Sequence, residues 1–230
     1  MDEPTVSISG LAGVLADPSR AAMLEILLGG GALPIGRLAR RVGITAATAS
    51  SHLRRLLDAH LVAIDIVGRE RHVRLAGPDV AELLERIAVL ADDRRRPSTQ
   101  VDRLRFARTC YDHVAGLLGV AIAERLCSIG WLHQTSDNFE PAPALFAWLA
   151  RHGHPISEDP RRPLTRACVD WTERVPHVAG RTGAAIATLF LDAGWVTRTR
   201  ESRALRLTGR GASALERELG LSLALRSTRA

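Results

Sequence analysis

The sequence predicts a mainly α-helical protein with short β-hairpins, an α+β fold whose C-terminal half is duplicated. Three observations predict it. Apolar residues recur at helical spacing over the first sixty residues, a basic alternating stretch follows at 61–76, and a segment rich in cysteine and histidine occurs twice after residue 105. We therefore expect an N-terminal domain at 1–95, a linker at 96–104 and a C-terminal domain at 105–230, with units at about 105–160 and 163–222.

Composition points to a soluble globular protein with an acidic partner. Hydrophobic residues make up 46% and charged residues 24% of the 230 residues, and the net charge is +6. The sequence has 31 arginines and no lysine. A guanidinium group suits bidentate contacts with phosphate, so nucleic acid is the first partner to consider.

Nothing in the sequence predicts a membrane span or a disulfide framework. No apolar run reaches the roughly 18 residues that a bilayer requires, and the acidic start "MDEPTVSISG" is unlike a secretion signal. Three cysteines are too few for a disulfide scaffold. We expect a cytoplasmic, nucleoid-associated protein with reduced thiols and no membrane partner.

The first predicted helix lies in "LADPSRAAMLEILLGGG". Asp17 is placed to cap its N-terminus and Pro18 suits its first position. Apolar residues follow, and three glycines end the helix. Its apolar side chains are Met23, Leu24, Ile26, Leu27 and Leu28.

The next stretch, "LPIGRLARRVGITAATASSHLRRLLDAHLV", has the spacing of a helix-turn-helix. Its first helix has one short apolar face, formed by Ile35, Leu38, Ala39 and Val42. Gly43 supplies a left-handed turn, and Thr45 can cap a second helix that runs through Leu57. The second helix of such a pair enters the DNA major groove.

A basic hairpin follows in "LVAIDIVGRERHVRLA", with its turn at Gly68 and Arg69. For any single arginine here, a solvated surface position is the simpler interpretation. As a group on two DNA-facing elements, the arginines favour contact with phosphates. They are Arg37, Arg40, Arg41, Arg54, Arg55, Arg69, Arg71 and Arg74, opposed only by Asp58, Asp65 and Glu70.

The segments "LADPSRAAMLEILL", "LARRVGITAATASSHLRRLLDAHLV" and "GRERHVRL" together resemble the ArsR-type family of bacterial winged-helix repressors. The resemblance implies a homodimer that sits on a palindromic DNA operator and leaves it when an effector binds. It places on the recognition helix Thr45, Ala46, Ala47, Thr48, Ser50, Ser51, His52, Arg54 and Arg55, and on the wing Arg69, Arg71 and Arg74. Short polar side chains can reach base edges, whereas Arg54 and Arg55 suit phosphates. For His52, a role in the core or in phosphate contact is more common than a role as a switch.

The sequence departs from that family where its known metal sensors bind their ions. The first helix of the helix-turn-helix reads "PIGRLARRV", without cysteine, and the later helix "DVAELLERIAVLADDRR" has no histidine. We expect this later helix to pack against its twin in a dimer, through Val80, Leu83, Leu84, Ile87 and Leu90. The sensing residues must therefore lie elsewhere.

The second half repeats itself. "HVAGLLGVAIAERLCSIGWL" aligns with "HVAGRTGAAIATLFLDAGWV" without a gap, and Trp131 and Trp195 each fall 18 residues after their histidine. Both units predict a helix, then Gly-Trp. The second unit continues as a basic hairpin, whereas we expect "LHQTSDNFEPAPALFAWLARHG" to replace that hairpin in the first. We interpret this half as a degenerate winged-helix scaffold used for sensing or dimerisation.

Each unit carries Arg-x-Cys-x-Asp followed by a histidine. We expect Cys110 and His113 to share one helix face, and Pro176 to start a helix that His177 opens. A pseudo-twofold axis would then gather Cys110, His113, Cys168 and His177, a ligand set for Zn²⁺, Cd²⁺ or Pb²⁺. Asp112 and Asp170 would ligate the ion or orient the histidines. Arg108 and Arg166 would lower the pKa of the thiols.

The repeated residues also allow roles other than metal binding. They could be structural, respond to another thiol-reactive effector, or hold a small organic ligand or haem; Cys127 has no counterpart and is treated as core. A Cys–His–Asp enzyme lacks a supporting phosphate loop or nucleophile elbow, and a chromosome-packaging protein would spread its arginines evenly. The sequence therefore predicts a non-enzymatic, dimeric transcriptional repressor with an effector-sensing C-terminal half.

Overall fold

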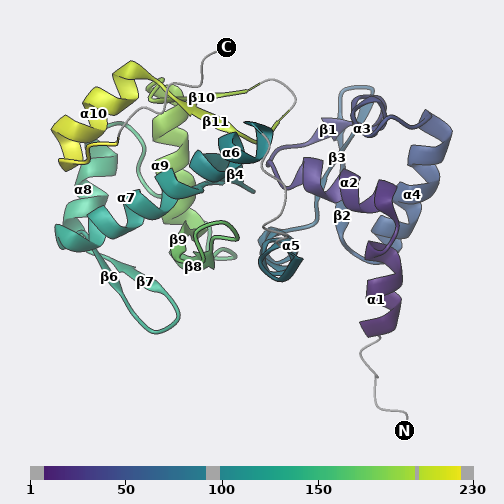
Figure 1. Ribbon diagram of the computed structural model, residues 1–230, viewed down its shortest axis with the longest axis horizontal. Helices are drawn as coiled ribbons and strands as arrows, with labels where there is room; N and C mark the ends of the chain where they lie inside the picture. Colours follow the sequence, from purple (N-terminus) through teal and green to yellow (C-terminus); the bar gives the residue numbers. More distant parts are fainter. Residues whose placement is uncertain (1–7, 92–98, 200–201, 224–230) are drawn as a thin grey trace, which may run out of the picture. The chain divides into compact units, whose positions relative to one another are not determined.

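A computed structural model describes residues 8–91, 99–199 and 202–223, which divide into two compact units, Met1–Leu84 and Glu85–Ala230 (Figure 1). The expected fold class is confirmed: helices alternate with short antiparallel hairpins. Within the described ranges, no helix combines the length and the hydropathy that crossing a membrane would require.

The first unit contains the predicted helices and hairpin together with two short elements that were not predicted, α1 and β1. In chain order the elements are α1 (Ile8–Leu15), α2 (Pro18–Leu27), β1 (Leu33–Pro34), α3 (Ile35–Val42), α4 (Ala46–Asp58), β2 (Val62–Val67) and β3 (Glu70–Leu75). Helix α5 (Pro78–Ala91) follows, and the boundary between the two units falls within it.

The predicted N-cap of α2 is confirmed. The Asp17 carboxylate accepts a hydrogen bond from the backbone N–H of Arg20 at 2.9 Å, and Pro18 occupies the first helical position. Met23, Leu24 and Leu27 are buried along the inner face of the helix. The local sequence therefore fixes both the start of α2 and its orientation.

The helix-turn-helix is also confirmed. Gly43 adopts a φ of +79°, the left-handed conformation predicted for the turn, and its N–H donates to the Ala39 carbonyl at 3.0 Å. Thr45 caps α4 by accepting from the Thr48 N–H at 3.1 Å. The helices pack through a set of small and branched residues, which are Leu38, Ala39, Ala49, Leu53 and Leu56.

The wing consists of β2 and β3, paired antiparallel across Gly68. The sheet has a third strand that was not predicted, because β1 pairs with β3 through Leu33 opposite Val73. A two-residue strand that ends in proline has no alternation from which it could be predicted.

The second unit repeats one order of elements, hairpin–helix–hairpin–helix, after α6 (Thr99–Phe106). The first copy is β4 (Arg108–Cys110), β5 (His113–Ala115), α7 (Leu117–Ser128), β6 (Leu132–Gln134), β7 (Phe139–Pro141) and α8 (Pro143–Arg151). The second is β8 (Arg166–Val169), β9 (Pro176–Ala179), α9 (Gly180–Asp192), β10 (Val196–Arg198), β11 (Leu205–Leu207) and α10 (Gly209–Leu219).

This arrangement corrects one expectation and limits another. The first copy keeps its second hairpin, β6–β7, and the helix α8 comes after it rather than in its place. Residues 99–104 of the predicted linker form most of α6, whereas residues 96–98 lie outside the described ranges.

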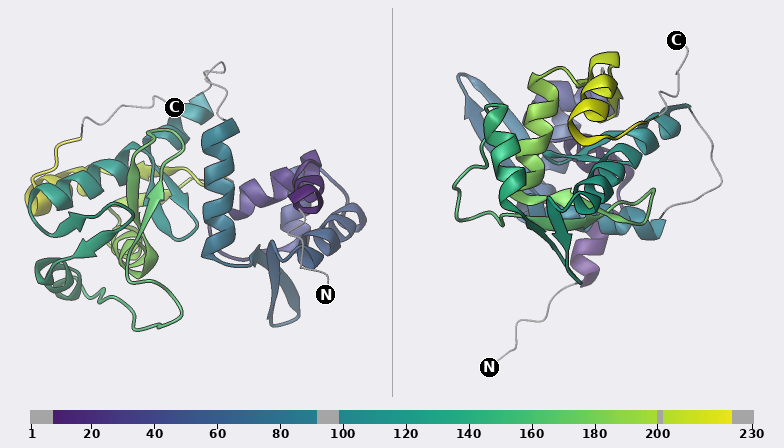
Figure 2. Two further views of the ribbon diagram at one scale, coloured as in Figure 1. Left: turned by 90° about the horizontal axis from the view of Figure 1, so that it is seen from below. Right: turned by 90° about the vertical axis from the view of Figure 1, so that its left-hand side faces the viewer.

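The two copies pack crosswise. Helix α7 of the first copy contacts β9 of the second, and α9 of the second contacts β5 of the first (Figure 2). Two glycines permit this approach, because a Cβ on Gly183 would lie 3.1 Å from the Cβ of His113 and one on Gly119 would lie 3.7 Å from the Cβ of His177. Each copy thus completes the packing of the other.

One apolar core holds both copies together. Phe190 of α9 is fully buried, with its ring centre 5.0 Å from that of Trp195, and Trp148 of α8 lies in the same cluster. All four tryptophans of the chain, Trp131, Trp148, Trp171 and Trp195, belong to the second unit. Tryptophan fluorescence therefore reports on this unit.

Phe190→Ala should destabilise the second unit by about 3–5 kcal/mol, because it removes a buried ring and leaves a cavity. The measurement is urea unfolding followed by tryptophan fluorescence. Phe146→Ala is the matched control, since Phe146 on α8 is 37% exposed; its unfolding midpoint should stay close to that of the unmodified protein. Equal midpoints for the two variants would contradict the assignment of Phe190 to the core.

Candidate metal centre and nucleic-acid interface

The four predicted metal ligands lie on hairpins, not on helices, which corrects the sequence prediction. Cys110 on β4 pairs directly across from His113 on β5, and Cys168 on β8 pairs across from His177 on β9. Pro176 begins the strand β9, and the helix begins at Gly180. A spacing of three residues fits a tight turn as well as a helix face, so the first motif alone could not distinguish them.

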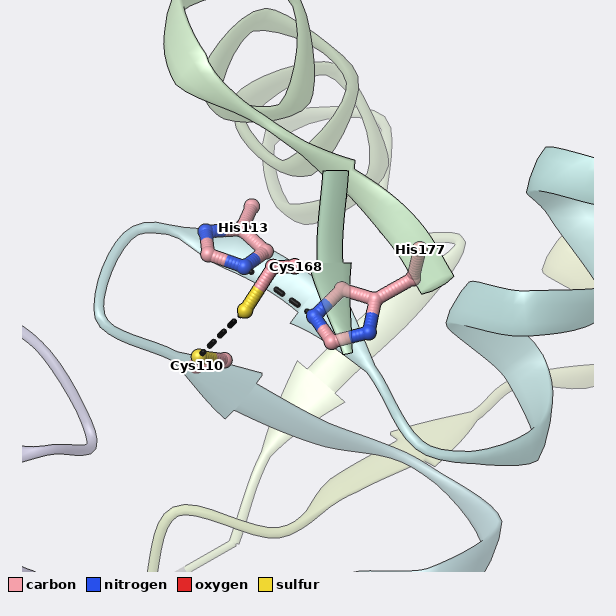
Figure 3. A group of neighbouring side chains, drawn as sticks. All are labelled: Cys110, His113, Cys168 and His177. Atoms are coloured by element: carbon pink, nitrogen blue, oxygen red, sulfur yellow. Dashed lines mark hydrogen bonds between the residues drawn. The ribbon is translucent and has the colours of Figure 1, made fainter. Parts of the chain in front are cut away.

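The predicted convergence does occur: all four side chains meet in one buried cluster (Figure 3). The two Sγ atoms are 3.9 Å apart, the two Nε2 atoms are 3.1 Å apart, and all four donor atoms lie within 4.8 Å of one another. A tetrahedral Zn²⁺ ion would hold two sulfurs about 3.8 Å apart and two nitrogens about 3.3–3.4 Å apart. The donor atoms therefore fit such an ion after small side-chain adjustments.

A carboxylate lies beside the other ring nitrogen of each histidine. Asp112 Oδ1 is 3.5 Å from His113 Nδ1, and Asp170 Oδ2 is 3.5 Å from His177 Nδ1. Histidines that bind a metal through Nε2 usually direct Nδ1–H toward such a group, which fixes the tautomer and the ring orientation. Of the two roles expected for Asp112 and Asp170, this geometry matches orientation of the histidines.

The surroundings of the two aspartates differ. Asp170 is fully buried and accepts hydrogen bonds from Arg108 at 3.0 Å and from the Gly116 N–H at 2.6 Å. Asp112 is partly exposed and accepts from Arg162 at 2.6 Å. Arg162 was not predicted, because it lies in an irregular segment with no motif around it.

The expected lowering of the thiol pKa does not occur at Cys110. Arg108 is fully buried, but its guanidinium is engaged with Glu85 and Asp170. The pKa of Cys110 is raised well above its ordinary value, first by the adjacent Cys168 thiol and then by burial. Cys110 is therefore a neutral thiol at pH 7 unless a cation displaces its proton.

The protonation states of His177 and Asp170 follow from their own surroundings. Burial and the neighbouring His113 lower the pKa of His177, so its imidazole is neutral, which is the form that binds metals. Burial by itself raises the pKa of Asp170, but the Arg108 guanidinium outweighs it and, with hydrogen bonds from Thr172 and the Gly116 N–H, holds that pKa below its ordinary value. A neutral imidazole thus faces an ionised carboxylate.

The recognition helix α4 and its cap present short polar and basic side chains on one surface. The predicted residues that are exposed there are Thr45, Ala46, Ala47, Thr48, Ser50, Ser51, Arg54 and Arg55. His52 is half-buried, with its Nδ1 3.7 Å from an Asp17 carboxylate oxygen. This contact links α4 to the N-terminus of α2.

The wing arginines fall into two groups. Arg69 and Arg71 are exposed near the turn, whereas Arg74 donates to Asp65 at 2.8 Å and to two backbone carbonyls. Arg74 is therefore engaged with its own sheet. The alternation of the strands predicts where these arginines lie but not this ion pair.

Part of the α5 surface predicted to face a twin is open. Ile87 is 37% exposed and Leu90 is 88% exposed, while Val80, Leu83 and Leu84 are half-buried. Dimer packing through this helix stays a prediction.

Comparison with known proteins decides the family. A family model described as "Helix-turn-helix domain" matches residues 15–65. The chain is 36% identical over 223 residues to YdfF of Bacillus subtilis (strain 168), an uncharacterized HTH-type transcriptional regulator, and the match covers 94% of this chain and 99% of YdfF. The chain belongs to the helix-turn-helix-type transcriptional regulators. The predicted resemblance to this class of regulator is confirmed, and the likeness to YdfF includes the duplicated half.

Two solved structures resemble part of this regulator. The DNA-binding domain of Mb0332 from Mycobacterium bovis, described as homodimeric and a possible ArsR-family regulator, is 31% identical, covers 38% of this chain and 80% of its own, and has a TM-score of 0.35. Rv0081 of M. tuberculosis is 30% identical, covers 41% of this chain and all of its own, and also has a TM-score of 0.35.

Gly183→Ala should disrupt the cluster, because the added Cβ would collide with the Val178 carbonyl and press on His113. We expect at least a tenfold loss of Zn²⁺ affinity, measured by competition with a chromophoric chelator. Gly209→Ala is the control, since nothing lies within 4 Å of the added Cβ. Unchanged Zn²⁺ affinity in Gly183→Ala would show that this glycine does not position the site.

Proposed function

We propose that this helix-turn-helix regulator is a dimeric repressor that a divalent thiophilic ion, Zn²⁺ or Cd²⁺ foremost, releases from its operator. The observation that carries the proposal is the convergence of two thiols and two imidazoles, from two copies of one motif, within 4.8 Å. The ligands are Cys110, His113, Cys168 and His177, with Asp112 and Asp170 behind the histidines.

Charge supports a divalent ion. All four side chains are buried, so an uncompensated charge among them would be costly. Two thiolates balance one dication, and the nearby Asp170 is already balanced by Arg108. Two sulfur and two nitrogen donors in a tetrahedral arrangement are typical of Zn²⁺, and Cd²⁺ shares the preference for thiolate. Pb²⁺ belongs in the same titration.

The closed ligand set favours a sensing or structural role over catalysis. A catalytic zinc keeps one position open for water or substrate, whereas four protein ligands fill a tetrahedral ion completely. The cavity beside the cluster, lined by Val114 and Val178 among others, measures about 10 Å³. Haem and other organic ligands need pockets of roughly 300–1,000 Å³.

Dimer formation and operator binding are proposed from surfaces of the first unit and of α5. The exposed apolar residues Ile87 and Leu90 on α5 suit contact with a second copy. The exposed residues of α4 suit the major groove, and the wing arginines Arg69 and Arg71 suit phosphates. A twofold dimer would then match a palindromic operator.

A second candidate is supported by one distance. Thiols whose sulfurs are 3.9 Å apart need little movement to form a disulfide, so a peroxide could act on the same pair. The buried, protonated state of Cys110 argues against rapid oxidation. Parallel titrations with peroxide and with metal distinguish the two.

Cys110→Ser and Cys168→Ser should each abolish metal-induced release while leaving operator affinity without metal unchanged. The measurement is fluorescence anisotropy of labelled operator DNA during Zn²⁺, Cd²⁺ or Pb²⁺ titration. Cys127→Ser is the matched control, because Cys127 on α7 is outside the cluster. If both cluster variants release DNA like the unmodified protein, the cluster is structural.

Arg54→Ala should weaken binding to all DNA sequences by a similar factor. It should also reduce the slope of log K against log salt by about one, because one phosphate contact is lost. The control is Arg151→Ala, which removes an exposed arginine from α8 in the second unit. An unchanged slope would remove Arg54 from the phosphate contacts.

A further inference from the structure

A single carboxylate oxygen connects the cluster to a buried chain of charges. Asp170 Oδ2 accepts from Arg108 Nη2 at 3.0 Å and from the Gly116 N–H at 2.6 Å, and it lies 3.5 Å from His177 Nδ1. Two hydrogen-bond donors and one histidine ring nitrogen thus converge on one oxygen. The other oxygen, Oδ1, is engaged by the Thr172 hydroxyl and backbone.

From Asp170 the charges continue to helix α5. The same Arg108 Nη2 also donates to Glu85 Oε2 at 3.3 Å, and Glu85 Oε1 accepts from Arg203 at 2.5 Å. Asp170 and Arg108 are fully buried and Glu85 is 1% exposed. Alternating charges shielded from water are strongly coupled, since no solvent compensates when one of them moves.

Glu85 connects this chain of charges to helix α5, which continues into the first unit. Glu85 is the first residue of the second unit, and α5 runs without a break from Pro78, in the first unit, to Ala91. A shift of Glu85 therefore acts on α5, the helix that continues directly from the DNA-binding unit.

The contact between the two imidazoles supplies two states for the cluster, one with that contact and one with both rings bound to an ion. With the two Nε2 atoms 3.1 Å apart, one imidazole donates Nε2–H to the other. Within the described residues His177 Nδ1 has no hydrogen-bond partner, although Asp170 lies 3.5 Å away. When both Nε2 atoms bind an ion instead, the Nε2–Nε2 hydrogen bond is lost, and the positive ion makes His177 Nδ1–H a stronger donor to Asp170.

We infer that Asp170 and Arg108 are positioning residues that transmit occupancy of the Cys–His cluster to Glu85 on α5. As His177 Nδ1–H approaches Asp170 Oδ2, it competes with Arg108 for that oxygen, and Arg108 shifts toward Glu85. This inference rests on the proposed metal-responsive function and names its regulatory path.

The other copy of the motif does not offer such a path. Asp112, the counterpart of Asp170, is paired with Arg162, which is about one quarter exposed and lies between α8 and β8. Water screens that pair. The coupling therefore runs through one histidine of the two, although the ligands are duplicated.

Glu85→Gln tests the inference, because Glu85 touches no proposed ligand. Its Zn²⁺ affinity should stay within about threefold of the unmodified protein, whereas the Zn²⁺-induced change in operator affinity should shrink at least fivefold. Glu124→Gln is the matched control, removing one exposed carboxylate from α7, and it should keep the full response. Asp170→Asn should weaken Zn²⁺ affinity by about 10–100-fold and should also lose the Zn²⁺-induced change in operator affinity.

A second measurement leaves Asp170, Arg108 and Glu85 unmodified. The Arg108 guanidinium lies 5.0 Å from the Trp171 ring centre, so movement of Arg108 should alter Trp171 fluorescence on Zn²⁺ addition. Trp171→Phe should remove most of that change while the other three tryptophans remain. A Zn²⁺-dependent signal that survives intact in Trp171→Phe would count against movement of Arg108.

The outcomes separate the two proposals. If Zn²⁺ binds the unmodified protein but leaves operator affinity unchanged, the proposed function and this inference both fail. If the unmodified protein responds and Glu85→Gln responds equally, only the inference is overturned. Loss of the response in Glu85→Gln with intact Zn²⁺ binding supports it.

Discussion

Cross-strand pairing of a cysteine with a histidine is the constraint on which the second unit depends. In each hairpin the two donors face each other from neighbouring strands, which fixes their separation without help from the rest of the fold. The crosswise packing of α7 and α9 then brings one pair against the other. Gly119 and Gly183 leave the space that the imidazoles occupy. Local pairing and the duplicated architecture together produce the four-donor cluster.

The sequence predicted the first unit well, because its signals are local. Asp17, Gly43 and Thr45 act through hydrogen bonds or backbone angles within a few residues, and each does what its position predicts. In the second unit, the repeat correctly predicted which residues converge. It correctly predicted the later hairpin β10–β11, but not the hairpins that carry the ligands, since Cys110 and His113 are three residues apart in both a helix and a tight turn.

The charge network was the least predictable part. Glu85 sits in "DVAELLERIAVL", where an acid on a helix suggests a solvent-exposed position, yet it is buried against Arg108. Its partners Arg108 and Arg203 are 23 and 118 residues away along the chain. Arg108 was expected to act on the thiols from its nearby sequence position, but the fold turns its guanidinium toward Asp170. Only long-range packing determines such pairings.

The duplication also has a consequence for how the cluster assembles. A site divided between two separate chains forms only when their concentration exceeds the dissociation constant of the pair. Here both donor pairs belong to one polypeptide, so the halves meet at a fixed, high effective concentration. The cluster can therefore form at any dilution of the protein. Covalent fusion also frees each copy to acquire different neighbours, as Asp112 and Asp170 have done, which identical subunits related by symmetry cannot do.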